Sequence, residues 1–148
     1  MITKVKAGTS FIAGRVYREA SSPANTTDNG NATDPDIRGV TMTLTCASPA
    51  CAATTTTGAD GSCRFNGLAA GSNCTVLETQ SAGYTNACNT RGTAGTADTG
   101  AGNSSITITG VPATGSTGNN FAETVGGGTP PPQPRPRWAG PCWPPCRP

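Results

Sequence analysis

The chain has 148 residues and a net charge of +2, enough length for one domain of about 100 to 130 residues plus an appendage. Only 34% of it is hydrophobic and 5% aromatic, while 20 residues are glycine and 13 are proline. The core must therefore be thin, and a helical fold is disfavoured. Basic residues are scattered and no long apolar segment occurs, so we expect no nucleic-acid partner and no membrane span.

The first half of the chain predicts two strands separated by a polar loop. Residues 10–17 (SFIAGRVY) place Ile12 and Val16 on one face and Phe11, Arg15 and Tyr17 on the other. Residues 18–36 are rich in Asn, Asp and Gly, which favour turns. Residues 39–46 (GVTMTLTC) alternate apolar and threonine residues with a period of two, as a half-buried strand does.

The stretch 54–84 predicts strand, tight turn, strand, corner and strand. Gly58 to Gly61 supplies turn residues, and Cys63/Phe65 and then Cys74/Val76 alternate with polar neighbours. Residues 85–103 predict a low-complexity loop, and 105–111 and 119–125 predict the last strands. About seven short strands with turns between them indicate an all-β, Ig-like sandwich of two sheets.

Composition divides the chain into three parts. Residues 1–9 are expected to be an N-terminal extended arm, residues 10–125 the sandwich, and residues 126–148 a Gly/Pro-rich tail. Proline at the density of this tail cannot join a sheet interior and favours polyproline II geometry.

Seven cysteines and no histidine indicate disulfides in an oxidising, extracellular setting. A zinc site is disfavoured because the spacing lacks paired C-x-x-C knuckles. Cys46 and Cys51 flank a short loop between strands and form the best predicted pair. The remaining connectivity stays open for Cys63, Cys74, Cys88, Cys142 and Cys146, and an odd cysteine could pair with another subunit or stay buried as a small hydrophobe.

The ordered runs IAGRVY, IRGVTMTLT, TTTTGADGSCRFNGLAAGSNCTVLETQSAGYTN and ITITGVPATGSTGNNFAE resemble the B-type (SdrD B-like) domain of serine-aspartate repeat proteins. They are also similar to the wider Cna B-type, prealbumin-like modules of bacterial surface proteins. The resemblance covers residues 10–125. It implies a prealbumin-like sandwich used as a stalk, spacer or repeat unit at the bacterial cell surface.

Many members of the resembled family carry a calcium loop after the first strand. The matching residues here are Glu19, Asp28, Asn29, Asp34 and Asp36, spread over an expanded loop. Carboxylate and amide oxygens are the ligands that calcium prefers, so the loop is a candidate calcium site. The alternative is an ordinary solvated turn, and no cofactor is required.

The family also implies a buried acid, for which Glu78 stands at the matching position. In Cna B-type relatives such an acid assists a Lys–Asn isopeptide bond, with Asn119 or Asn120 as the amide partner here, but the first strand lacks the lysine. We therefore expect Glu78 to be an acid that needs a donor, such as Tyr84 or a backbone N–H.

The tail contains both tryptophans, Trp138 and Trp143, beside two cysteines. Exposed indole and thiol groups favour association, so we expect the tail to dock on a partner; the alternative is a spacer to another domain. Phe11 and Tyr17 are further candidate assembly residues. The acids are scattered and histidine is absent, so we expect no enzyme.

These features together predict a structural subunit of an extracellular bacterial fibre, pilus-like filament or sheath. Its partners are other copies of itself, joined through terminal arms and disulfides, or other surface proteins. The alternative is a calcium-dependent adhesin or spacer module within a larger cell-surface protein.

Overall fold

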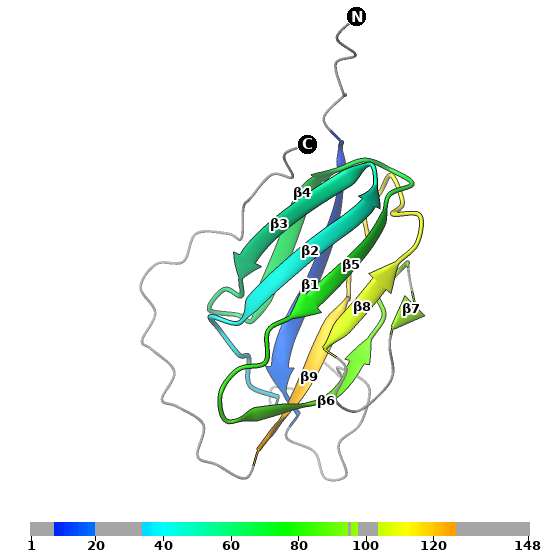
Figure 1. The fold of residues 1–148 in the computed structure, drawn as a ribbon. Helices are drawn as coiled ribbons and strands as arrows, with labels where there is room; N and C mark the ends of the chain where they lie inside the picture. The colour runs from blue at the N-terminus through cyan, green and yellow to red at the C-terminus, as the bar shows by residue number, and fades with distance from the viewer. Residues whose placement is uncertain (1–7, 20–33, 95, 98–103, 127–148) are drawn as a thin grey trace, which may run out of the picture.

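The computed structural model describes residues 8–19, 34–94, 96–97 and 104–126, which form two stacked β-sheets (Figure 1). The β1 sheet has the order β4 (Ser62–Leu68), β1 (Ser10–Arg18), β9 (Asn120–Val125), β6 (Tyr84–Thr90). The β2 sheet has the order β3 (Ala50–Thr56), β2 (Thr41–Ser48), β5 (Asn73–Glu78), β8 (Ser105–Ile108), β7 (Thr96–Ala97). The predicted all-β, Ig-like sandwich is confirmed.

Strand β2 shows why the apolar alternation selects this fold. Met42, Leu44 and Cys46 are buried, and the threonines between them face outward. β2 pairs antiparallel with β3 on one side and with β5 on the other. Its inward side chains therefore lie near the middle of the sandwich.

The core is built mainly from aliphatic side chains of both sheets, with two aromatic rings. It comprises Ile12, Val16, Ile37, Val40, Met42, Leu44, Phe65, Leu68, Val76, Ile106, Ile108, Val111 and Phe121, together with three cysteines. Tyr17, Cys88 and Ala122 form a second buried cluster. The aliphatic character follows from the low aromatic content. Each buried Val, Leu, Ile, Met or Phe side chain of this core contributes roughly 1.5–3 kcal/mol.

Strand β1 is shared between two partners in its own sheet. It pairs antiparallel with β4 from Ser10 to Arg15, and parallel with β9 from Val16 to Arg18. At Gly14 the backbone of the β8–β9 connection passes so close that an added Cβ would lie 1.8 Å from the carbonyl oxygen of Asn119. A side chain at position 14 cannot fit without moving that connection.

The predicted loop over residues 85–103 is wrong in its first part. Residues Tyr84–Thr90 form β6, which pairs antiparallel with β9, and Thr96–Ala97 form the short β7. Asn86 and Asn89 are buried within β6. Polar residues at these positions gave the segment the composition of a loop, since asparagine is depleted in strands.

The parallel pairing of β1 with β9 places the two ends of the body far apart. The chain enters β1 at Ser10, whereas β9 leaves the sheet at Val125, beside the opposite end of β1 (Figure 1). At roughly 3.3 Å per residue, these ends lie about 30 Å apart. Among the residues that the structure describes, none forms a helix that is long and apolar enough to cross a membrane.

Candidate functional site

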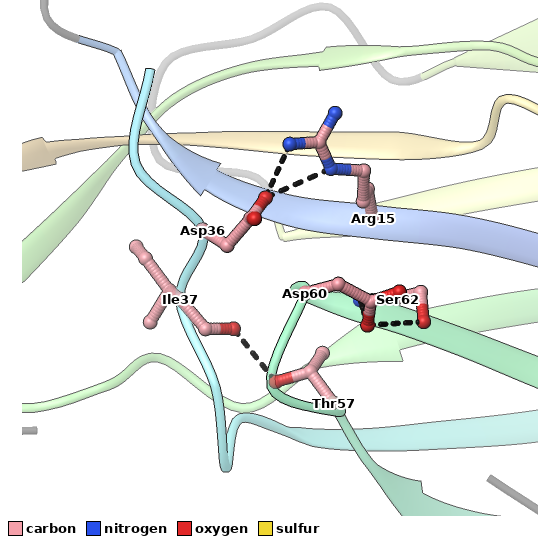
Figure 2. A network of polar contacts seen from close by, with 6 residues as sticks. All are labelled: Arg15, Asp36, Ile37, Thr57, Asp60 and Ser62. Carbon is pink, nitrogen blue, oxygen red and sulfur yellow. Dashed lines mark hydrogen bonds and ion pairs between the residues drawn. The ribbon is translucent and has the colours of Figure 1, made fainter. Parts of the chain in front are cut away.

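An ion pair closes the end of the polar loop against β1 (Figure 2). Oδ1 of Asp36 accepts a hydrogen bond from Nε of Arg15 at 2.9 Å and a second one from Nη2. Backbone bonds continue this attachment, because Arg18 N donates to Pro35 O at 2.8 Å and Ile37 N donates to Val16 O at 3.0 Å. The final residues of the loop are therefore fixed on β1.

Thr57 ties the same segment to the end of β3 (Figure 2). Its hydroxyl is buried, donates to the carbonyl oxygen of Ile37 at 2.7 Å and accepts from Val40 N at 3.0 Å. A single threonine thus satisfies two buried backbone groups where the chain enters β2.

The turn between β3 and β4 completes this network. Oδ1 of Asp60 accepts hydrogen bonds from Ser62 Oγ at 2.6 Å and from Ser62 N at 3.2 Å. The bond from the Ser62 hydroxyl is the main cause that holds the pKa of Asp60 below its ordinary value. Gly61 has a φ of +66°, and a Cβ there would lie 2.4 Å from Val16 O, so the turn requires glycine.

The candidate calcium residues are only partly within the described region. Glu19 and Asp34 are both buried and flank residues 20–33, while Asp28 and Asn29 lie outside the described residues. Asp36 already binds the guanidinium of Arg15. Within the described ranges, acids and thiols do not gather in a group of three or more that could hold a metal ion. Calcium binding stays a prediction.

Two buried carboxyl groups face each other across the sandwich. Glu78 of β5 is 2% exposed and Glu123 of β9 is 0% exposed. Gln80 Nε2 donates a hydrogen bond to Glu123 Oε2. Neither oxygen of Glu78 receives a hydrogen bond from an N–H or hydroxyl group of the described residues, so the expected donor Tyr84 or backbone N–H is not its partner.

Burial is the largest cause that raises the pKa of Glu78, followed by the negative charge of Glu123. Burial also raises the pKa of Glu123, against the lowering effect of its hydrogen bond with Gln80. Two carboxylates this close cannot both ionise cheaply. The pair therefore holds a proton, and Glu78 is the acid that retains it.

The predicted Cys46–Cys51 disulfide is wrong, because Cys46 is bonded to Cys74, with a Cα–Cα distance of 4.0 Å. Cys46 lies opposite Cys51 on one side and opposite Cys74 on the other. In an antiparallel sheet a residue forms a narrow pair with one neighbouring strand and a wide, hydrogen-bonded pair with the other. The short Cα separation identifies Cys46 and Cys74 as the narrow pair, which is the one that a disulfide joins.

The other described cysteines differ in environment. Cys63 and Cys88 are buried thiols at 5% and 6% exposure. Burial is the main cause that raises the pKa of Cys88, with contributions from the charges of Glu19 and Glu123. Cys51 is half-buried at the sandwich rim and is disulfide-bonded. Cys142 and Cys146 lie outside the described residues.

The prediction of Tyr17 as an assembly residue is wrong, because its side chain is 0% exposed and packs with Cys88 and Ala122. Period-two alternation placed it on the face away from the main core, but that face is itself covered at this point. Phe11 is half-buried, with the guanidinium carbon of Arg64 3.4 Å from its ring centroid. Trp138 and Trp143 lie outside the described residues.

The outer face of the β2 sheet carries a shallow, mostly apolar hollow that the sequence analysis did not single out. Its lining includes Thr43, Thr45, Thr75, Leu77 and Thr107. Leu77 is exposed at the centre of this face, and Thr75 Oγ1 lies 3.4 Å from Thr107 Oγ1. The signal in the sequence was the outward threonine at every second position of adjacent strands.

A thin-cored Ig-like sandwich with a cross-strand disulfide defines the class of small β-sandwich modules. A model of the SdrD B-like domain family matches residues 20–126, well over half of the chain, and the chain belongs to that family. SdrD B-like domains are modules of bacterial surface proteins. No individual curated protein matches the sequence.

Proposed function

We propose that this protein is a structural subunit of an extracellular bacterial surface assembly, in which copies associate through their terminal arms and are stabilised by disulfides. Family membership supports the surface setting. Such a subunit needs no catalytic centre; its work is to hold a shape and to join its neighbours.

The observation that carries this proposal is the position of the two chain ends. Because β1 and β9 are parallel neighbours, the segment before Ser10 and the segment after Val125 leave from opposite ends of the body. Copies can then follow one another in a line, with the end of one body against the start of the next. A repeated heterologous contact of this kind builds a filament when its rotation does not close into a ring.

The body combines a small hydrophobic core with a stabilising disulfide, which suits a repeated structural subunit. Its core is small and its Cys46–Cys74 disulfide joins adjacent strands of the β2 sheet. A cross-link over a separation of 28 residues contributes about 3–4 kcal/mol in the chain-entropy description. The disulfide offsets the limited apolar area that such a chain can bury.

The proposal is tested with the full chain, exported into an oxidising compartment and purified without reductant. We expect oligomers by light scattering, linear particles by negative-stain electron microscopy, and multimer bands on non-reducing gels that collapse with reductant. The matched variant changes Trp138 and Trp143 to serine and keeps every cysteine. It should assemble more weakly, and a native chain that stays monomeric at high concentration contradicts the proposal.

A second candidate function is a calcium-dependent spacer or adhesin module in a larger surface protein. The observation that favours it is the burial of Glu19 and Asp34 at the two ends of residues 20–33. Thermal unfolding with calcium and with a chelator tests it, with Asp34→Asn as the variant. A melting temperature that rises with calcium in the native chain and not in the variant supports this function.

A further inference from the structure

The outer face of the β2 sheet carries no charged side chain along the described strands β2, β3, β5 and β8. Its outward positions hold threonine, serine, alanine, asparagine and Leu77. The outer face of the β1 sheet, in contrast, carries Arg15 and Arg64. Charged residues are depleted from the cores of protein interfaces, so the outer β2 face is the one of the two that suits burial against a partner.

Leu77 stands near the middle of the outer β2 face. It belongs to β5, the third strand in the order of this five-stranded sheet, and its side chain is 48% exposed (Figure 1). The strand register places Thr43 beside it on β2 and Ser105 beside it on β8, and the next row of the sheet pairs Thr75 with Thr107. A single large apolar side chain therefore rises among short ones, at the border of the shallow hollow.

A ridge and a hollow on the same face make that face complementary to a second copy of itself. In a two-fold contact the same patch is used by both copies, so Leu77 of each copy can enter the hollow of the other. Sheets that pack face to face interdigitate the side chains of their facing surfaces. Short threonine side chains allow a close approach, and their hydroxyls can bond to one another, as Thr75 Oγ1 and Thr107 Oγ1 do at 3.4 Å within one copy.

The size of the outer β2 face also fits a second copy. Neighbouring strands lie about 4.8 Å apart and rise about 3.3 Å per residue, so this five-stranded sheet spans roughly 24 Å by 20 Å. Two such faces in contact bury on the order of 1,000 Å², which is the area that a specific interface needs. An uncharged face offers nothing for an acidic or a basic partner to pair with, so it favours a like surface.

We propose that the outer β2 faces of two copies pack together around a two-fold axis that passes near Leu77. The result is a side-by-side dimer of sandwiches. This contact goes beyond the end-to-end association through the terminal arms, because it joins neighbouring bodies laterally and uses only the described sheet.

The test uses the full chain with Trp138 and Trp143 changed to serine, which weakens association through the tail and leaves the outer β2 face unchanged. Sedimentation equilibrium should give a mass that rises with concentration to twice that of the monomer. Leu77→Lys brings two like charges together at the axis and should raise the dissociation constant of the dimer at least about tenfold. The matched control, Thr85→Lys, adds the same charge at an exposed position of the β1 sheet and should keep the dimer.

A mixture of oppositely charged variants separates a specific contact from a folding defect. Leu77→Lys and Leu77→Glu should each be monomeric, and an equimolar mixture should recover dimers, because opposite charges then meet across the axis. A monomer at every concentration in the tail variant, a dimer that survives Leu77→Lys, or a mixture that stays monomeric overturns the inference.

The proposed function is judged separately, on the chain with its native tail. A native chain that forms side-by-side dimers sensitive to Leu77→Lys, and no linear particles, contradicts the proposed function and supports the outer β2 contact. Linear particles whose assembly is unchanged by Leu77→Lys, together with a monomeric tail variant, support the proposed function and overturn the outer β2 contact.

Discussion

Replacing Glu78 with glutamine should change how the stability of the protein depends on pH. Glu78 is buried opposite Glu123, and its pKa is raised above the ordinary value of 4.5. The folded state therefore binds a proton that the unfolded state releases once the pH exceeds that value. The stabilising contribution of this bound proton is fully present below about pH 4.5. It is lost as the pH rises toward the folded-state pKa of Glu78.

The size of the change in the free energy of unfolding follows from the one proton that the folded state binds and the unfolded state releases. Each pH unit in this window lowers the free energy of unfolding by up to about 1.4 kcal/mol. Between pH 5 and pH 7 the native chain should therefore lose roughly 2–3 kcal/mol. Glutamine keeps the shape of Glu78, does not titrate, and can donate a hydrogen bond to Glu123. Most of the slope should disappear in Glu78→Gln.

Urea unfolding followed by circular dichroism at pH 5, 6, 7 and 8 measures this slope. Asp60→Asn is the matched control, because the pKa of Asp60 is lowered and its contribution is lost only as the pH falls below the ordinary value of 3.8. The control should keep the native slope from pH 5 to pH 8. An equal slope in Glu78→Gln, or a flat profile in the native chain, would refute the assignment of the buried proton.

Three further substitutions test the body itself by thermal or urea unfolding. Gly14→Ala should cost about 1–3 kcal/mol, because its Cβ would overlap the Asn119 carbonyl, and native stability would contradict the close approach. Thr57→Val should cost about 1–3 kcal/mol by leaving two buried backbone groups without their hydrogen bonds, whereas an unchanged melting temperature would contradict that role. Replacing Cys46 and Cys74 together by alanine should cost about 3–4 kcal/mol, and a loss under 1 kcal/mol would show that this bridge does not brace the body.

Local alternation was sufficient to predict the sandwich. Met42 and Leu44 alternate with threonine, and β2 forms where that pattern stands. The same logic failed at Tyr84–Thr90, because Asn86 and Asn89 occupy buried positions that a hydrophobic pattern cannot reveal. Single-strand patterns report which face a residue occupies, and they do not report what covers that face, which is why Tyr17 was misplaced.

The contacts of the candidate site depend on the order of the strands in the sheets, and this order could not be read from the sequence. Cys46 and Cys51 are close in the chain, but the narrow pair is Cys46 with Cys74, since β5 lies beside β2. Glu78 was recognisable as a buried acid from the resemblance, whereas its partner Glu123 was one scattered acid among several. Its inward position, two residues after Phe121 on β9, was the signal that could have identified it.

The parallel contact between β1 and β9 also determines how the body meets tension. A pull between Ser10 and Val125 acts along the two strands in opposite directions. The backbone hydrogen bonds that join Val16–Arg18 to Phe121–Glu123 are therefore loaded in shear, and all of them are loaded at the same time. A pair loaded in this way has to break as a set, unlike a hairpin that is peeled open one bond after another. Resistance to a single-molecule pull should therefore be governed by this short ladder, and the rate of forced unfolding is the quantity that reports it.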